Sequence, residues 1–177
     1  MGAIVTTVAM TDCAGLWRRT LLIEADGTRD DTPGVLWLQG PTGYVDSRGF
    51  AGRLHQDGDV FAWHRAVDLQ PPGPFPDAGR MHWDGEVLVE TGVHENYVEH
   101  WVRDPVDPTP TGALFLSGPN GAPALLVRAG ALFGWAGGTT VVTGVKRREL
   151  AISLSGNEIQ ANGVRWTIQG SEGNVDL

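Results

Sequence analysis

The chain has 177 residues, a formal net charge of −8 and a pI near 4.9. Its length suits one domain with a sizeable core, and a hydrophobic content of 41% excludes a disordered chain. The acidic balance argues against nucleic acids and anionic membranes as partners. A lone cysteine, Cys13, excludes an internal disulfide, no apolar run reaches transmembrane length, and the first ten residues lack the basic region of a signal peptide, so we expect a cytoplasmic protein.

The first half of the chain has the pattern of a series of short strands. Residues 1–14 have no clear hydrophobic period and form a lead-in, and a first strand is expected over residues 16–24. Asp-Gly pairs at residues 57–58 and 84–85 indicate β-hairpins. Seven further strands are expected near residues 35–39, 43–48, 50–56, 59–69, 78–83, 86–92 and 96–103.

Two proline-rich stretches interrupt this pattern. Residues 71–76 (Pro-Pro-Gly-Pro-Phe-Pro) cannot continue a paired ladder, because proline lacks the amide donor, so we expect a rigid loop at one end of a barrel. Residues 104–111 have the composition of a linker. Beyond them, strands are expected at 114–117, 124–128, 132–135, 139–142, 150–154 and 164–168, with a weak helix near 143–149.

We therefore predict an all-β protein, a single antiparallel β-barrel over residues 1–177 with little helix. In this prediction residues 104–111 are a connection within the barrel, and the later strands complete its sheet, because closure removes exposed edges. The alternative, a separate small sheet formed by residues 112–177, stays open.

Charged and aromatic residues share strand faces in the first half. Two sets at alternate positions each point to one side of a strand: Tyr44, Asp46 and Arg48, and Tyr97, Glu99 and Trp101. A polar pocket inside the barrel would explain this pattern, and a solvent-facing ion pair is the alternative. Val45 and Ser47 would make a poor core face, which favours the pocket.

His64 and Asp68 lie in the strand that precedes the first proline-rich loop. A carboxylate that orients an imidazole would make a general base, but four strand residues span roughly 13 Å. Direct contact would therefore need a β-bulge, and a structural role for His64 is the more common outcome. Asp68 and Gln70 are better placed, at a barrel rim.

A series of motifs runs in order through the central two-fifths of the chain. They contain Trp37, Gln39, Tyr44, Asp46, Arg48, Phe50, Gly52, Trp63, His64, Arg65, Asp68, Gln70, Asp77, Gly79, Met81, Glu90, Gly92, Tyr97, Glu99 and Trp101. This series resembles the Hri family of fungal proteins and their bacterial relatives. The resemblance implies a lipocalin-like (calycin) barrel and no particular reaction. Relatives usually have a longer insert where this chain has only Gly49 between Arg48 and Phe50.

A ligand site inside the barrel is the functional prediction. A buried acid that is only partly paired has a raised pKa that suits acid–base catalysis, and aromatic rings would stack on a flat ligand, although many of them can equally be core. The candidate catalytic residues are Asp46, Glu99 and Asp68. The candidate substrate-binding residues are Trp37, Gln39, Tyr44, Arg48, Trp63, His64, Arg65, Gln70, Glu90, Tyr97, Trp101 and Arg128.

Three functions fit this site, in descending order. The first is an enzyme without a cofactor that performs cyclisation, isomerisation, dehydration or addition on a small metabolite. The second is a non-catalytic small-molecule binding protein, and the third is a protein-interaction module. No metal is expected, because the five histidines show no ligand spacing, and a homodimer stays open.

Overall fold

The computed structural model describes residues 7–32 and 34–177, and these residues form antiparallel strands with only short 3-10 helices. The expectation of an all-β barrel protein with little helix is confirmed. No helix in the described ranges is long and apolar enough to cross a membrane.

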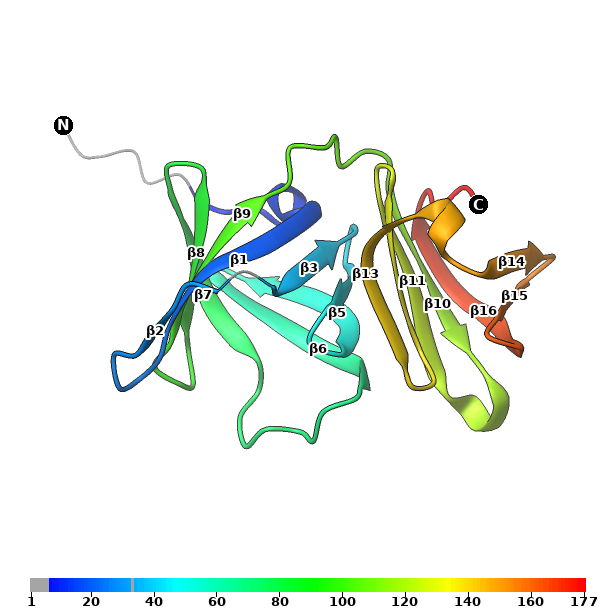
Figure 1. The fold of residues 1–177 in the computed structure, drawn as a ribbon, viewed down its shortest axis with the longest axis horizontal. Coiled ribbons are helices and arrows are strands. Elements are labelled where there is room, and N and C mark those ends of the chain that lie inside the picture. Colours follow the sequence, from blue (N-terminus) through cyan, green and yellow to red (C-terminus); the bar gives the residue numbers. More distant parts are fainter. Residues whose placement is uncertain (1–6, 33) are drawn as a thin grey trace.

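The first half of the chain closes into an eight-stranded barrel (Figure 1). Its strands are β1 (Gly15–Ile23), β3 (Leu36–Gln39), β4 (Gly43–Asp46), β5 (Phe50–Asp57), β6 (Val60–Asp68), β7 (Ala78–Asp84), β8 (Val87–Gly92) and β9 (Val98–Arg103). The short β2 (Arg29–Asp30) extends the end of β1. Pairing of β1 with β9, from Trp17 opposite Arg103 to Ile23 opposite Val98, closes the barrel.

The second half forms a separate seven-stranded sheet with the order β13-β12-β11-β10-β16-β15-β14. Its strands are β10 (Thr111–Ser117), β11 (Pro123–Ala129), β12 (Leu132–Gly137), β13 (Thr140–Lys146), β14 (Ile152–Ser155), β15 (Glu158–Ala161) and β16 (Val164–Gly173). The prediction that these strands complete the barrel is wrong, because β1 is long enough to pair with both β3 and β9. Residues 104–111 therefore join two sheets.

Two elements of the second sheet differ from the sequence prediction. The strand β15 was not expected, since only two of its four residues are apolar. The expected helix near residues 143–149 is instead the end of β13 followed by the 3-10 helix Arg147–Glu149. The β-branched residues Val141, Val142 and Thr143 favour the extended conformation there.

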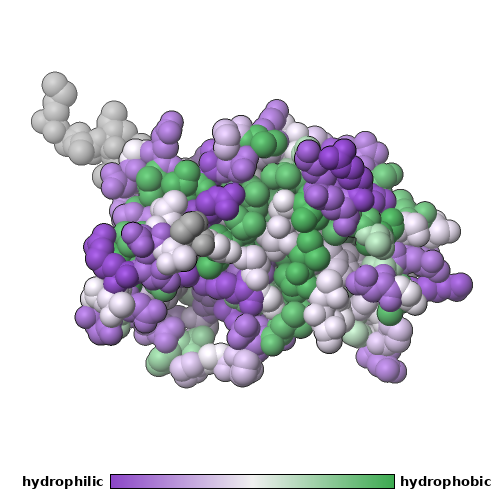
Figure 2. Space-filling model, in the orientation of Figure 1, coloured by the Kyte–Doolittle hydropathy of each residue, from purple (hydrophilic) through white to green (hydrophobic). Residues whose placement is uncertain are grey.

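The two sheets pack face to face through a layer of small and branched apolar side chains. Gly134 of β12 lies so close to the barrel that an added Cβ would be 3.0 Å from the Cβ atom of Val45. Glu172 of β16 accepts hydrogen bonds from the amide of Thr42 at 2.8 Å and from the amide of Gly43 at 2.7 Å. Figure 2 shows hydrophobic surface along the line where the sheets meet.

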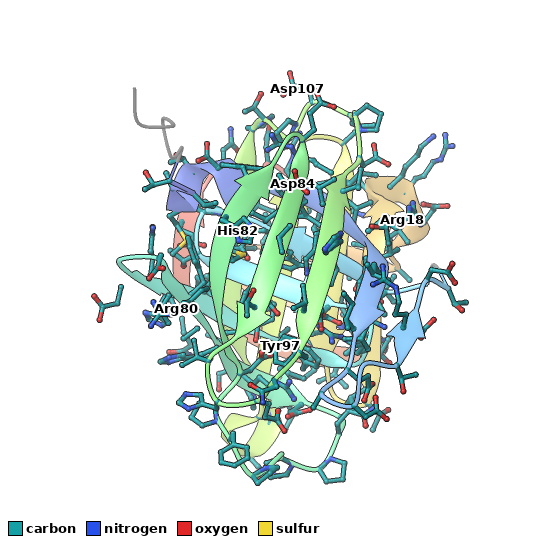
Figure 3. The ribbon with its side chains drawn as sticks, turned by 90° about the vertical axis from the view of Figure 1, so that its left-hand side faces the viewer. Arg18, Arg80, His82, Asp84, Tyr97 and Asp107 are labelled. Atoms are coloured by element: carbon teal, nitrogen blue, oxygen red, sulfur yellow. The ribbon has the colours of Figure 1, made fainter. Side chains whose placement is uncertain are left out.

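Polar side chains of β7 lie on the face of the barrel away from the second sheet (Figure 3). Arg80, His82 and Asp84 alternate along β7 and are exposed. Arg80 forms a 2.6 Å ion pair with Asp59, and both side chains are more than half exposed, so the pair contributes little to stability.

One end of the barrel is filled by aromatic side chains. Trp17 stacks on Trp37 at a centroid distance of 5.7 Å, and Trp37 makes edge contacts at 5.6 Å with both Trp63 and Trp101. The 3-10 helix Met10–Cys13 packs on this cluster, and the Trp17 indole donates a 2.7 Å hydrogen bond to the carbonyl of Cys13. Burial raises the pKa of the Cys13 thiol to about 12.

Candidate functional site

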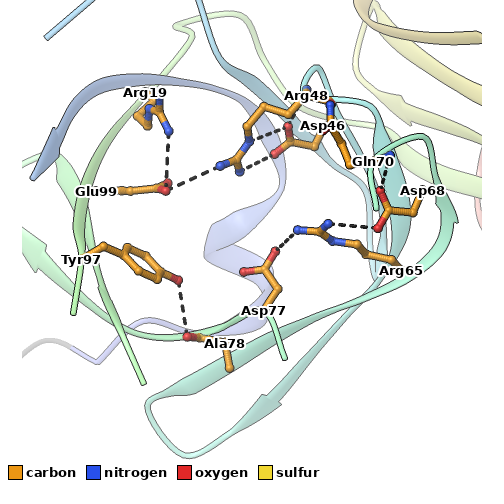
Figure 4. Close-up of polar contacts among 10 residues, drawn as sticks. All are labelled: Arg19, Asp46, Arg48, Arg65, Asp68, Gln70, Asp77, Ala78, Tyr97 and Glu99. Atoms are coloured by element: carbon orange, nitrogen blue, oxygen red, sulfur yellow. Dashed lines mark hydrogen bonds and ion pairs between the residues drawn. The ribbon is translucent and has the colours of Figure 1, made fainter. Parts of the chain in front are cut away.

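The other end of the barrel opens into a cavity of about 1280 Å³. The proline-rich loop of residues 70–76 lies at its mouth, where the exposed Phe75 ring stacks on His94. The aromatic residues of the wall are Trp37, Phe50, Trp63, Tyr97 and Trp101, and its charged residues include Arg19, Asp46, Arg48, Arg65, Asp68, Asp77, Glu90 and Glu99. Figure 4 shows how these charged residues, other than Glu90, face one another.

Asp46 and Arg48 form a closed pair in the cavity wall. Asp46 ends β4, and the tight turn through Gly49 returns the chain so that Arg48 folds back on it. The Arg48 guanidinium donates to both Asp46 carboxylate oxygens, at 3.0 and 2.9 Å, and the Arg48 amide adds a third bond at 2.8 Å. Asp46 is 3% exposed, and Arg48 occupies most of the acceptor sites of its carboxyl group.

Glu99 lies deeper in the cavity, between two arginines. Its Oε1 atom is 3.6 Å from Arg19 and 3.6 Å from Arg48. Its Oε2 atom is buried and has no hydrogen-bond partner among the described residues. Burial raises the pKa of the Glu99 carboxyl, although the positive charges of Arg48 and Arg19 oppose that rise.

Glu90 of β8 lies directly opposite Glu99 of β9 in the sheet register. Residues paired in this way have Cβ atoms roughly 5 Å apart and project to the same face. Gly79 of the next strand makes room for the Glu90 side chain, since an added Cβ would be 2.5 Å from the Cγ atom of Glu90.

No arginine or lysine in the described part of the chain forms an ion pair with Glu90. Burial raises the pKa of Glu90 well above its usual 4.5, and the negative charges of Glu99 and Asp77 add to the effect. The carboxyl groups of Glu90 and Glu99 thus share one wall, and only Glu99 lies beside arginines.

A β-bulge brings Asp68 to the same side of β6 as Arg65. The β5–β6 register shifts so that Gly52 pairs with Arg65 and Ala51 pairs with Val67, which leaves Ala66 as the extra residue. Arg65 and Asp68 consequently face the same side and form a 3.1 Å ion pair. A second 3.1 Å ion pair joins Arg65 to Asp77.

The same bulge does not bring His64 to Asp68. The His64 side chain is exposed, and its ring is 4.2 Å from that of His55 on the outer surface of β5 and β6. His64 borders the cavity, but its imidazole stacks away from it, so the structure contains no His64–Asp68 dyad.

Two predicted ligand-binding residues, Gln39 and Tyr44, lie in the core instead. Gln39 is fully buried, accepts a 3.0 Å hydrogen bond from the Trp37 indole and donates one to the Thr42 carbonyl. Tyr44 is also fully buried, and burial raises the pKa of its phenol. Both lie behind the cavity wall rather than in it.

Arg128 lies outside the barrel altogether. It belongs to β11 of the second sheet, where its guanidinium donates to the carbonyls of Gly130 and Val175 at 2.7 and 2.9 Å. The prediction that Arg128 binds substrate in the barrel is wrong, because the barrel closes without its strand.

The other predicted site residues line the cavity, namely Trp37, Asp46, Arg48, Trp63, Arg65, Asp68, Gln70, Glu90, Tyr97, Glu99 and Trp101. Arg19, Phe50 and Asp77 also line it and were not assigned a ligand contact. Arg19 follows the inward-facing Trp17 by two positions, and this alternation was the available signal. In the described ranges no group of three or more His, Cys, Asp or Glu residues could hold a metal ion.

No family model and no curated protein matches the chain. Among solved structures, the chain is similar to the uncharacterized protein YLR301w from Saccharomyces cerevisiae, with a TM-score of 0.53 and 14% sequence identity. The likeness covers 89% of this chain and 98% of that chain, so it extends over both sheets. At this identity it shows the fold alone, and the Hri resemblance stays a prediction.

Proposed function

We propose that this protein is a cofactor-independent enzyme that transfers a proton on a small molecule held in the barrel cavity. The observation that carries the proposal is the pair of buried carboxyl groups, Glu90 and Glu99, at opposed positions of β8 and β9 in the cavity wall. A pair of carboxyls whose surroundings push their pKa values apart can supply one acid and one base.

The charges around the pair favour a division of roles. Glu99 has Arg19 and Arg48 nearby, which stabilise its carboxylate and suit it to act as the base. Glu90 has no cationic partner among the described residues and faces Glu99, so it retains its proton more readily and suits the acid. Both groups project from one wall, so a proton would leave and return on the same face of the substrate.

The remaining wall residues support binding and orientation. Arg48 holds Asp46 and Arg65 holds Asp68, so the two acids that the sequence also suggests as catalytic are better suited to positioning these arginines. Trp37, Trp63 and Trp101 give a flat substrate apolar surfaces. Cyclisation, isomerisation, dehydration and addition all require only such positioning and a proton donor or acceptor. The single cysteine supports a cytoplasmic setting for this activity.

A metabolite extract incubated with the purified protein tests the proposal by mass spectrometry. We expect one species to disappear while another appears, of equal mass or differing by water. Glu90→Gln and Glu99→Gln should abolish this conversion, because an amide of the same shape can neither give nor take the proton. Glu86→Gln, which makes the same change in the exposed β7–β8 turn, is the matched control and should convert the species normally.

A non-catalytic binding protein is the second candidate, and the size of the cavity is the observation that favours it. In that case a species would leave the free pool and return unchanged when the protein is denatured. Conversion that survives in both glutamine variants would contradict the acid–base assignment.

A further inference from the structure

The carboxylates that line the cavity outnumber its cations. Seven acidic residues line it against three arginines. The acids are Glu24, Asp46, Asp68, Asp77, Glu90, Glu95 and Glu99, and the cations are Arg19, Arg48 and Arg65. Low-dielectric walls focus such a field, so a ligand that approaches this cavity meets a negative potential.

The three arginines are already engaged by the protein's own acids. Arg48 is held by Asp46 at 2.9 Å, and Arg65 lies between Asp68 and Asp77 at 3.1 Å from each. Arg19 contacts Glu99 at 3.6 Å. An anionic ligand would therefore have to displace one of these acids and would also face the remaining carboxylates.

Two acids of the wall are buried and incompletely paired. Glu90 is 5% exposed and has no ion pair among the described residues, and Glu99 is 6% exposed with its Oε2 atom unpartnered. A buried carboxylate oxygen without a partner is costly, so a ligand that donates hydrogen bonds or carries positive charge would gain the most here.

Aromatic rings surround these acceptors. Tyr97, just before β9, and Trp101 within β9 lie two positions either side of Glu99 and line the cavity with it. The protein's own guanidinium groups already rest on such rings, with Arg65 at 3.7 Å from the Phe50 centroid and Arg48 at 5.9 Å from that of Trp101. Carboxylates set among aromatic faces are the arrangement that recognises organic cations.

We infer that the cavity binds an organic cation, a protonated amine or quaternary ammonium group carried on a flat apolar body, with Glu90 and Glu99 facing the positive charge. The inference rests on the proposed function in one respect, that a small molecule occupies the barrel. It adds the chemical class of that molecule.

Binding of such a cation is coupled to proton release. The groups that face Glu90 are Glu99 and Tyr97 from the β9 side, Asp77 before β7, and Arg48 from the β4–β5 turn. Burial and the charges of Glu99 and Asp77 raise the pKa of Glu90, whereas a bound cation would favour its carboxylate. Affinity for the cation should accordingly increase as the pH rises through the titration of Glu90.

Calorimetric titration with three probes of similar shape tests the inference. The probes are 2-phenylethylamine, 2-phenylethanol and 3-phenylpropionate. We expect the amine to bind at least about tenfold more tightly than the alcohol, and the carboxylate to bind most weakly. Glu90→Gln should weaken the amine about tenfold or more, while Glu86→Gln, the matched exposed change, should leave its affinity unaltered.

Three outcomes would overturn the inference: no detectable binding of the amine, equal or tighter binding of the alcohol or carboxylate, and an unchanged amine affinity in Glu90→Gln. The extract experiment separates this failure from that of the proposed function. Conversion of a neutral or anionic metabolite that depends on Glu90 would retain the proton-transfer enzyme and reject the cation site. Amine selectivity without any conversion would retain the cation site and reject the proton-transfer enzyme.

Discussion

The two sheets of this protein are built from the same kind of hairpin but have different interiors. In the second sheet the inward face is apolar, with Trp135 and Trp166 in edge contact at 5.7 Å. The barrel has a similar aromatic cluster around Trp37 at one end and a charged cavity at the other. Both sheets alternate inward and outward residues, so alternation alone does not create a site.

Closure of the first sheet into a barrel accounts for the difference between the two interiors. Pairing of β1 with β9 encloses a volume that the side chains do not fill, and four of the inward acids there contact arginines. In the described second sheet, β13 and β14 lie at opposite edges and do not pair. The face of this sheet that carries Trp135 and Trp166 is instead packed with apolar side chains.

The largest expected effect comes from one tryptophan in each sheet. Trp17→Ala and Trp166→Ala should each lower the free energy of unfolding by about 3–5 kcal/mol, because both indoles are almost fully buried. Urea denaturation measures both losses. Only Trp17→Ala should also impair conversion in the extract experiment, since Trp17 supports Trp37 in the cavity wall. Lost conversion in a folded Trp166→Ala protein would contradict the assignment of the site to the barrel alone.

The second-largest effect on stability is expected at the contact between the sheets. Glu172→Ala should destabilise the protein by about 2–3 kcal/mol, because the partly buried amides of Thr42 and Gly43 lose a charged acceptor. Glu172→Gln keeps one acceptor oxygen and should lose less. Urea denaturation followed by signals from each sheet should show the two transitions separating in the alanine variant. A single unchanged transition would mean that the apolar layer alone couples the sheets.

A smaller, pH-dependent effect is expected at Glu90. Its pKa is raised in the folded state, so folding is favoured below the unfolded pKa near 4.5, and stability declines as the pH rises through the folded pKa. Each pH unit between the two pKa values corresponds to about 1.4 kcal/mol. Glu90→Gln should therefore be more stable than wild type at neutral and alkaline pH. Thermal denaturation across pH measures this, and parallel curves for both proteins would contradict it.

The smallest effect is expected on the outer surface of the barrel. His64→Ala should change stability by no more than about 0.5 kcal/mol and leave the cavity intact, because the His64 ring is exposed. The pKa of His55 is lowered, first by burial and then by the neighbouring His64, so it should rise in this variant. An NMR titration of His55 measures the change. A loss of conversion in His64→Ala would show that His64 does take part in the site.

Much of the barrel could be predicted from the sequence. The Asp-Gly turns and alternating strands place β3 to β9 within a few residues, because turn chemistry and period-two patterning are local properties. The shared face of Glu99 with Trp101 also follows from spacing alone, whereas Arg48 meets Asp46 through the turn after β4. That Arg65 and Asp68 share a face could not be predicted, because the bulge at Ala66 reverses the alternation between them.

The sequence by itself determined the all-β class, the hairpins and the acids and aromatics of the first half. Only the tertiary structure decided which strands close the barrel, that Arg128 lies in a separate sheet, and that Glu90 faces Glu99. The physical reason is that these features depend on pairing between distant strands. The closed sheet determines which strands pair and which carboxyl groups are buried with a shifted pKa. Turns and alternation depend only on residues that are close in the sequence.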